Sequence, residues 1–132
     1  MSGEKDLEVL IAGMTPELGD EDYIFCTTEQ PWDEMLALKP WAMTKEKEGL
    51  SLILEKAIAD GKGIPYQGIY RRITLNVHSS LDAVGLTAAI STRLAASGIS
   101  ANVVAAFYHD HVFVQRDRAK EALELLEELA EN

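Results

Sequence analysis

The triplet His109-Asp110-His111 holds the side chains best suited to chemistry in this chain. Imidazole and carboxylate groups are common metal ligands. The triplet falls at an expected hairpin turn, however, where residues two apart stop sharing one face of a strand. A metal would also need a third ligand, such as His78. We therefore predict no metal site and interpret the triplet as a polar turn with a half-buried histidine; a small metal-dependent enzyme using these histidines is the less favoured alternative.

Nucleophilic catalysis finds little support in the sequence. A nucleophile needs a base within hydrogen-bond reach. Cys26 lies in an apolar run, where a cysteine is usually inert, while Ser79 and Ser80 follow His78 on a strand whose successive residues point to opposite faces. The chain has no G-x-S-x-G, no phosphate-binding loop and no C-x-x-C motif. We therefore expect no catalytic residues, no cofactor and no enzymatic activity.

Composition narrows the function classes further. The chain has 132 residues, 47% of them hydrophobic, and a net charge of -10 from 12 basic and 22 acidic side chains. Excess negative charge disfavours nucleic acid and anionic membrane surfaces, because both require basic groups. No apolar run approaches the roughly 20 residues that span a bilayer, and no signal peptide is predicted. With a single cysteine, these features favour a cytoplasmic protein that binds neither nucleic acid nor membrane.

The elements that must position these residues are clearest in the second half of the chain, which reads β-α-β-β-α. In order, they are a strand at Arg72–His78, a helix at Val84–Ser97 that ends at Gly98, a strand at Ser100–Tyr108, a turn at His109-Asp110, a strand at His111–Val114, and a helix at Arg118–Ala130 capped by Asp117. This order is typical of an α+β fold with an antiparallel sheet and helices on one face. One strand is missing after the last helix.

The first half could supply that missing strand. Its expected elements are a helix at Glu4–Gly13, a turn at Pro16 and Gly19, a strand at Tyr23–Thr28, a largely loop segment at Glu29–Glu48 with a short element at Met35–Leu38, a strand at Leu50–Leu54, a helical turn at Glu55–Asp60 and a linker at Gly61–Pro65. If Tyr23–Thr28 or Leu50–Leu54 completes the second-half sheet, the halves are interlocked. A fragment of residues 67–132 should then fail to fold by itself.

Local motifs in the second half resemble the ACT domain family. The motif-bearing stretches are VHSSLDAVGLTAAI with Gly85 before a helix, Ala96–Ile99 before a strand, Asn102 within that strand, and Arg118–Leu123 in the closing helix. The chain is also similar to small bacterial tandem ACT-like proteins that carry YIFCT and EGLSLIL upstream, here Tyr23–Thr27 and Glu48–Leu54. The segment Gln30–Lys47, with Trp32 and Trp41, departs from this pattern; these tryptophans cover a core edge or, alternatively, anchor an interface.

The resemblance implies tandem ferredoxin-like βαββαβ units, a divergent one at residues 1–66 and a second at residues 67–132, related to the regulatory ACT domains of aspartate kinase. It also implies a regulatory module that binds a small molecule, with an amino acid as the expected ligand, and that forms a homodimer. Carried over position by position, the ligand site comprises Ser80, Leu81, Asp82, Ala83, Val84, Gly85 and Thr87, with Asn102 and Val103 as a second wall.

Physical chemistry supports that location, and two questions stay open. A glycine at a strand–helix junction lets the backbone approach a ligand, and helix N–H groups favour a carboxylate. Asp82 could hold an ammonium group, but it is more often a helix cap. The alternative function is a protein–protein interaction module that has lost its ligand site. Under the sensor interpretation we expect Gly85→Leu to abolish ligand binding and leave folding largely intact.

Overall fold

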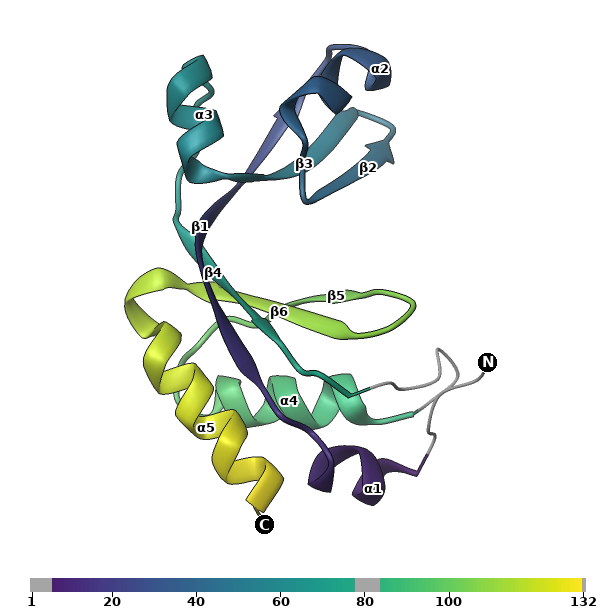
Figure 1. Ribbon diagram of the computed structural model, residues 1–132, viewed down its shortest axis with the longest axis vertical. Helices are drawn as coiled ribbons and strands as arrows, with labels where there is room; N and C mark the ends of the chain where they lie inside the picture. The colour runs from purple at the N-terminus through teal and green to yellow at the C-terminus, as the bar shows by residue number, and fades with distance from the viewer. Residues whose placement is uncertain (1–5, 78–83, 132) are drawn as a thin grey trace. The chain divides into compact units, whose positions relative to one another are not determined.

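The computed structural model describes residues 6–77 and 84–131, and their packing divides the chain into two compact units. Unit 1 combines the described residues of Met1–Asp20 and Arg71–Asn132, and unit 2 is Glu21–Tyr70. The chain therefore leaves unit 1 after Asp20 and returns to it at Arg71 (Figure 1). The boundary between residues 66 and 67 inferred from the sequence stays a prediction.

Unit 1 contains the sheet order expected of a ferredoxin-like fold. Its elements are α1 (Leu7–Ala12), the start of β1 (Glu17–Thr28), β4 (Tyr70–Thr74), α4 (Leu86–Ala95), β5 (Asn102–Ala105), β6 (Asp110–Gln115), η2 (Arg116–Arg118) and α5 (Ala119–Glu131). The strand order is β1-β4-β6-β5. The start of β1 lies beside β4, where the Arg71 guanidinium donates to the Gly19 carbonyl. The start of β1, Glu17–Asp20, therefore supplies the strand missing from the second half, whereas the predicted segment Tyr23–Thr28 of the same strand pairs with β3 in unit 2.

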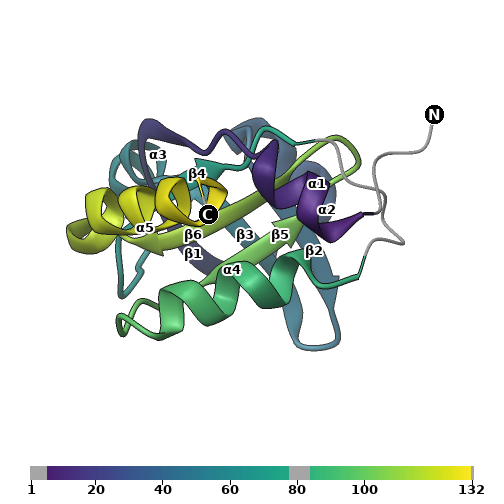
Figure 2. The same cartoon turned by 90° about the horizontal axis from the view of Figure 1, so that it is seen from below.

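Helices α1, α4 and α5 cover one face of the unit 1 strands (Figure 2). In α4 the residues at i, i+4 and i+8, Leu86, Ile90 and Leu94, are buried, as their spacing predicts. Helix α5 buries Ala122 and Leu126 in the same cluster. Leu10 of α1 and Met14, which follows the helix, belong to that cluster, as does Ile73 of β4. The hydrophobic core of unit 1 therefore depends on residues from both ends of the chain.

Unit 2 is a smaller antiparallel layer with short helices. It contains the rest of β1, α2 (Trp32–Met35), η1 (Leu36–Leu38), β2 (Ala42–Glu46), β3 (Gly49–Glu55) and α3 (Lys56–Lys62), with strand order β2-β3-β1. In β1 and β3, Cys26 pairs with Leu52 and Ile24 with Leu54. Ile24, Leu52, Leu54 and Ala59 form its core. The predicted strand Leu50–Leu54 is confirmed.

Some boundaries differ from the sequence-based expectation. Strand β2 lies within Glu29–Glu48, where a loop was expected; it pairs with β3 while Thr44, Lys45 and Glu46 stay exposed, so no hydrophobic alternation marks it. The expected turn at Gly19 is wrong, because Gly19 lies inside the long strand β1.

Two further strands are shorter than their sequence pattern indicates. Strand β4 ends at Thr74, since Asn76 has φ of 53° and leaves the extended conformation. Strand β5 ends at Ala105, and Asp110 belongs to β6, where it pairs with Ala105. The turn of this hairpin therefore lies at residues 106–109.

Candidate functional site

The ligand site expected from the sequence is described in part. Ser80, Leu81, Asp82 and Ala83 lie outside the described residues, as does His78. Val84, Gly85 and Thr87 come together at the start of α4, where Val84 is 82% exposed and Thr87 is exposed. Helix α4 begins without a side-chain cap among the described residues. Its first N–H groups give this end a preference for negative charge.

Gly85 is required by the backbone at this junction. It is the N-cap residue of α4 and has φ of 103° and ψ of -15°, a left-handed conformation that L side chains rarely adopt. A Cβ atom at this position would lie 3.0 Å from Cδ2 of Leu7 in α1. Leucine here strains the backbone and requires the Leu7 side chain to shift, so this geometry disfavours the expectation that Gly85→Leu leaves folding largely intact.

The second wall expected from the sequence lies on β5. Val103 packs against the core cluster that includes Leu86, the first residue of α4. Asn102 is exposed, and its side-chain amide donates to the Phe113 carbonyl at 3.2 Å. Because successive strand residues point to opposite faces, at most one of these two side chains can face a given ligand. The Asn102 side chain ties β5 to β6.

The histidine triplet lies on β6 and the turn before it. Nδ1 of His111 lies 3.0 Å from Oγ1 of Thr74. Burial, followed by the positive charge of Arg72 and then of His109, lowers the pKa of His111 to about 4. Burial raises the pKa of the Asp110 carboxyl. His111 is therefore a neutral, half-buried imidazole at physiological pH.

No cluster of three metal-ligating side chains occurs within residues 6–77 and 84–131. His78, the third ligand considered from the sequence, lies outside those ranges.

Unit 2 contains a pocket that the sequence did not indicate. It has a volume of about 460 Å³ and lies between β1, the segment of α2 and η1, and the loop that follows α3. Its apolar lining includes Cys26, Met35, Leu38, Leu52 and Ile64. Ligand pockets typically range from about 300 to 1,000 Å³, so this one has the size for a small molecule. Its residues come from segments far apart in the sequence, so local patterns carry no signal for it.

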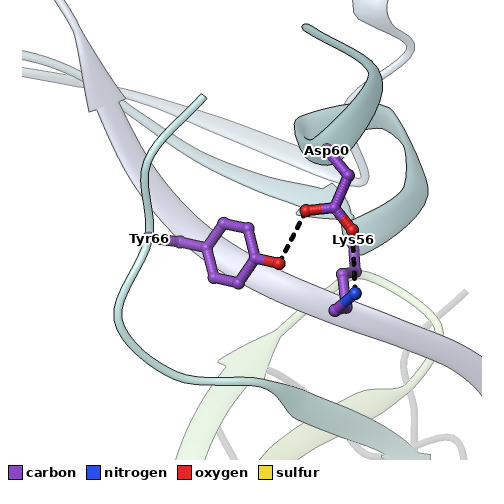
Figure 3. Close-up of polar contacts among 3 residues, drawn as sticks. All are labelled: Lys56, Asp60 and Tyr66. Atoms are coloured by element: carbon purple, nitrogen blue, oxygen red, sulfur yellow. Dashed lines mark hydrogen bonds and ion pairs between the residues drawn. The ribbon is translucent and has the colours of Figure 1, made fainter. Parts of the chain in front are cut away.

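Side-chain contacts hold one wall of this pocket. Asp60 of α3 accepts a hydrogen bond from the Tyr66 hydroxyl at 2.7 Å and pairs with Lys56 at 2.8 Å (Figure 3). The Lys56 ammonium and the Tyr66 hydroxyl together lower the pKa of Asp60. These contacts fasten the segment after α3 to the helix, and all of them are solvent-exposed, so each contributes little to global stability.

Comparison with known proteins identifies the chain's relatives. The ACT domain family matches residues 2–71 and again residues 69–128. A crystal structure of a Vibrio cholerae protein of unknown function, described as a possible transport protein, is 49% identical, with a TM-score of 0.87 over 96% of this chain and 97% of that one. No curated protein matches the sequence.

More distant structures share the fold alone. The ligand-free regulatory subunit of aspartate kinase from Thermus thermophilus is 12% identical, with a TM-score of 0.61 over 88% of this chain and 97% of that one. Aspartate kinase from Clostridium acetobutylicum is 13% identical, with a TM-score of 0.63 over 89% of this chain and 34% of that one.

The described helices include none with the length and apolar character needed to cross a membrane. Three observations support one family assignment. They are two successive family matches, a relative of nearly the same length, and the ferredoxin-like strand order of unit 1. The chain therefore belongs to the ACT domain family, whose members are typically regulatory modules that bind small molecules such as amino acids.

Proposed function

We propose that this protein is a regulatory module without catalytic activity that binds a free amino acid at the start of α4. The site comprises Ser80 to Gly85 and Thr87, with β5 as a neighbouring wall. The observation that carries this proposal is Gly85, a left-handed N-cap residue at which α4 begins with no side-chain cap from residues 6–77 or 84–131. A ligand carboxylate is the natural partner of such a helix end. A cytoplasmic location is part of the same proposal.

A homodimer is the assembly that best fits this role. ACT domains often dimerise, and β5 is the last strand in the sheet order of unit 1. An edge strand exposes unpaired backbone groups that a second copy can satisfy. Binding of an amino acid to one arrangement of the copies would shift the population toward it.

The second candidate function is a protein–protein interaction module, and one observation favours it. Phe107 and Tyr108, at the tip of the β5–β6 hairpin, are 58% and 65% exposed. Their rings lie edge to face with centroids 5.1 Å apart. Tyrosine is enriched among the residues that contribute most to binding at protein interfaces.

A thermal-shift screen against the twenty amino acids tests the sensor proposal. A ligand at 100 times its Kd adds about 2.7 kcal/mol to the free energy of unfolding, which raises the melting temperature by several degrees. Thr87→Glu places a carboxylate in the first turn of α4 and should remove the shift by repelling the ligand carboxylate. Thr92→Glu is the matched control, because Thr92 is also exposed on α4 but lies beyond its first turn.

The results of the thermal-shift screen distinguish the amino-acid sensor from the protein–protein interaction module. A shift with one amino acid or a few related ones, lost in Thr87→Glu and kept in Thr92→Glu, supports the sensor. No shift with any amino acid contradicts it and makes the interaction module the leading function. Equal loss of the shift in both variants would place the ligand away from the start of α4.

A further inference from the structure

Unit 2 contains a second pocket, called here the aromatic pocket, between β1 and the segment that leads from α3 to β4 (Figure 1). Its volume of about 440 Å³ lies in the range of small-molecule sites. Three aromatic side chains line it, although aromatic residues make up only 7% of the chain; they are Phe25, Tyr66 and Tyr70. The aromatic pocket adjoins the first pocket, and the residues common to both are Cys26, Thr27 and Pro65.

Two of the three rings form a corner of the aromatic pocket. The ring centroids of Phe25 and Tyr70 lie 5.1 Å apart, and the ring planes are inclined at 76°. Phe25 is 38% exposed and points away from the unit 2 core, because its neighbour Ile24 is buried in that core. Gly68 makes room for the Tyr70 ring, since a Cβ atom at Gly68 would lie 3.1 Å from Cε1 of Tyr70. The two rings therefore stand as adjoining walls.

The third ring is held in place by the unit 2 core and by Asp60. Tyr66 packs against that core, and its hydroxyl donates to the Asp60 carboxylate at 2.7 Å (Figure 3). This bond raises the pKa of Tyr66, so the hydroxyl stays protonated. A phenol that donates to a carboxylate is polarised, and its ring becomes richer in electrons. Asp60 also pairs with Lys56, but Lys56 does not line the aromatic pocket.

The electrostatic character of the aromatic pocket favours a cation with an apolar surface. No lysine or arginine of the described chain lines it. The faces of aromatic rings carry partial negative charge and attract cations, and the net charge of -10 adds to that attraction. A quaternary ammonium group suits such a site best, because its methyl groups contact the rings while its charge interacts with their faces.

We propose that the aromatic pocket binds a small quaternary ammonium compound of the choline type, with its methyl groups against the rings of Phe25, Tyr66 and Tyr70. Gln67 is exposed and also lines the pocket, so its side-chain carbonyl can accept a hydrogen bond from a hydroxyl group of the ligand. The start of α4 has the opposite preference, for negative charge. The two proposed sites therefore take different ligands, and the failure of one leaves the other standing.

Titration of choline with the intact protein, followed by the proton NMR signal of its methyl groups, tests the proposal. Protons that lie over the faces of aromatic rings are shielded, so the methyl signal should move upfield as the complex forms. The alcohol 3,3-dimethylbutan-1-ol has the shape of choline without the charge. We expect it to bind about tenfold less tightly than choline, because it lacks the attraction between the cation and the rings.

Variants of the ring positions locate the binding site. Phe25→Leu and Tyr70→Leu should each weaken choline binding by about five- to tenfold, because each removes one aromatic face. Tyr70→Phe keeps the ring and should bind choline within about twofold of the wild type. Tyr108→Leu is the matched control, because Tyr108 is an exposed aromatic residue that does not line the aromatic pocket. Thermal unfolding of each variant establishes that it is folded at the temperature of the titration.

Four results would overturn the proposal. Choline whose methyl signal does not move in the presence of the wild-type protein has no such site. Equal affinity for choline and 3,3-dimethylbutan-1-ol would show that charge takes no part. Equal affinity of Tyr70→Leu and Tyr70→Phe would remove the Tyr70 ring from the site, and this comparison holds even if Phe25→Leu fails to fold. Loss of binding in Tyr108→Leu would place the cation at the hairpin tip of unit 1.

Discussion

Oγ1 of Thr74 in β4 and Nδ1 of His111 in β6 lie 3.0 Å apart, joining two neighbouring strands through their side chains. Burial and the charges of Arg72 and His109 keep this imidazole neutral, with a pKa of about 4. The sequence suggested metal binding or catalysis for the histidine triplet. Within it, His111 instead connects two strands of the unit 1 sheet.

The first prediction concerns acid stability. The unfolded chain binds the His111 proton near the ordinary pKa of 6.5, whereas the folded chain binds it only at about 4. The unfolded state therefore holds more protons between these values, and the free energy of unfolding falls as pH drops from 6.5 to 4, by about 1–2 kcal/mol after solvent screening of this partly exposed group. Urea unfolding of the wild type and of His111→Asn across this range measures the effect.

Asp110 changes the free energy of unfolding with pH in the opposite direction, so its effect must be separated from that of His111. Burial raises the pKa of its carboxyl, so protonation of Asp110 favours the folded state as pH falls. Comparing His111→Asn with the wild type isolates the histidine, since Asp110 is present in both. Thr74→Val should cost about 1 kcal/mol at neutral pH yet keep the wild-type slope, because burial and not this hydrogen bond depresses the pKa. An identical slope in His111→Asn would contradict the prediction.

The second prediction contrasts two glycines. Gly85→Ala should destabilise the protein by about 1–3 kcal/mol, because it forces a side chain into a left-handed conformation 3.0 Å from Leu7. Gly61→Ala should stabilise it by about 0.5–1 kcal/mol, because Gly61 lies in α3 and a Cβ there meets no atom within 4 Å. Thermal unfolding of both variants tests the pair, and equal effects would show that the conformation of Gly85 is not constrained.

The third prediction concerns the composition of unit 1. A fragment of residues 67–132 lacks residues 6–20, which include α1, the start of β1 and the core residues Leu10 and Met14. The Thr15 N–H also donates to the Leu75 carbonyl, and the Asn76 amide donates back to the Thr15 carbonyl, each at 3.1 Å. We expect this fragment to show no cooperative thermal transition. Residues 71–131 joined through a glycine–serine linker to residues 6–20 should show one, and a cooperative transition of the shorter fragment would refute the argument.

The fourth prediction concerns the wall of the unit 2 pocket. Tyr66→Phe removes the hydrogen bond to Asp60, so the segment after α3 should open more often and Cys26 should be alkylated roughly two- to fivefold faster. Tyr108→Phe is the control, because Tyr108 lies on the exposed hairpin tip of unit 1. Equal alkylation rates in the wild type and Tyr66→Phe would show that other contacts hold this wall.

Periodic hydrophobic patterns predicted α1, α4, α5 and most strands, because one buried face imposes its spacing on the sequence. Leu86, Ile90 and Leu94 in α4 are the clearest case. Strand β2 has exposed residues along most of its length and carries no such signal. Local motifs around Gly85 indicated the family, which is confirmed.

The pocket of unit 2 could not be predicted in this way. Cys26, Met35 and Ile64 reach it from β1, α2 and the loop after α3. Only tertiary packing brings these segments together, and each residue taken singly has the character of an ordinary core residue. The same applies to the pKa of His111, which depends first on burial and then on charges from β4 and the hairpin turn.

The discontinuous make-up of unit 1 also determines the order in which its parts become available during protein synthesis. Residues 6–20 leave the ribosome before all of unit 2, yet Leu10 packs with Leu126, which is synthesised near the end of the described chain. Because the ribosome adds about 5–20 residues per second, the apolar side chains of the α1 segment stay exposed to water for several seconds or longer. The nascent chain therefore presents an apolar segment that chaperones can bind until α5 is complete.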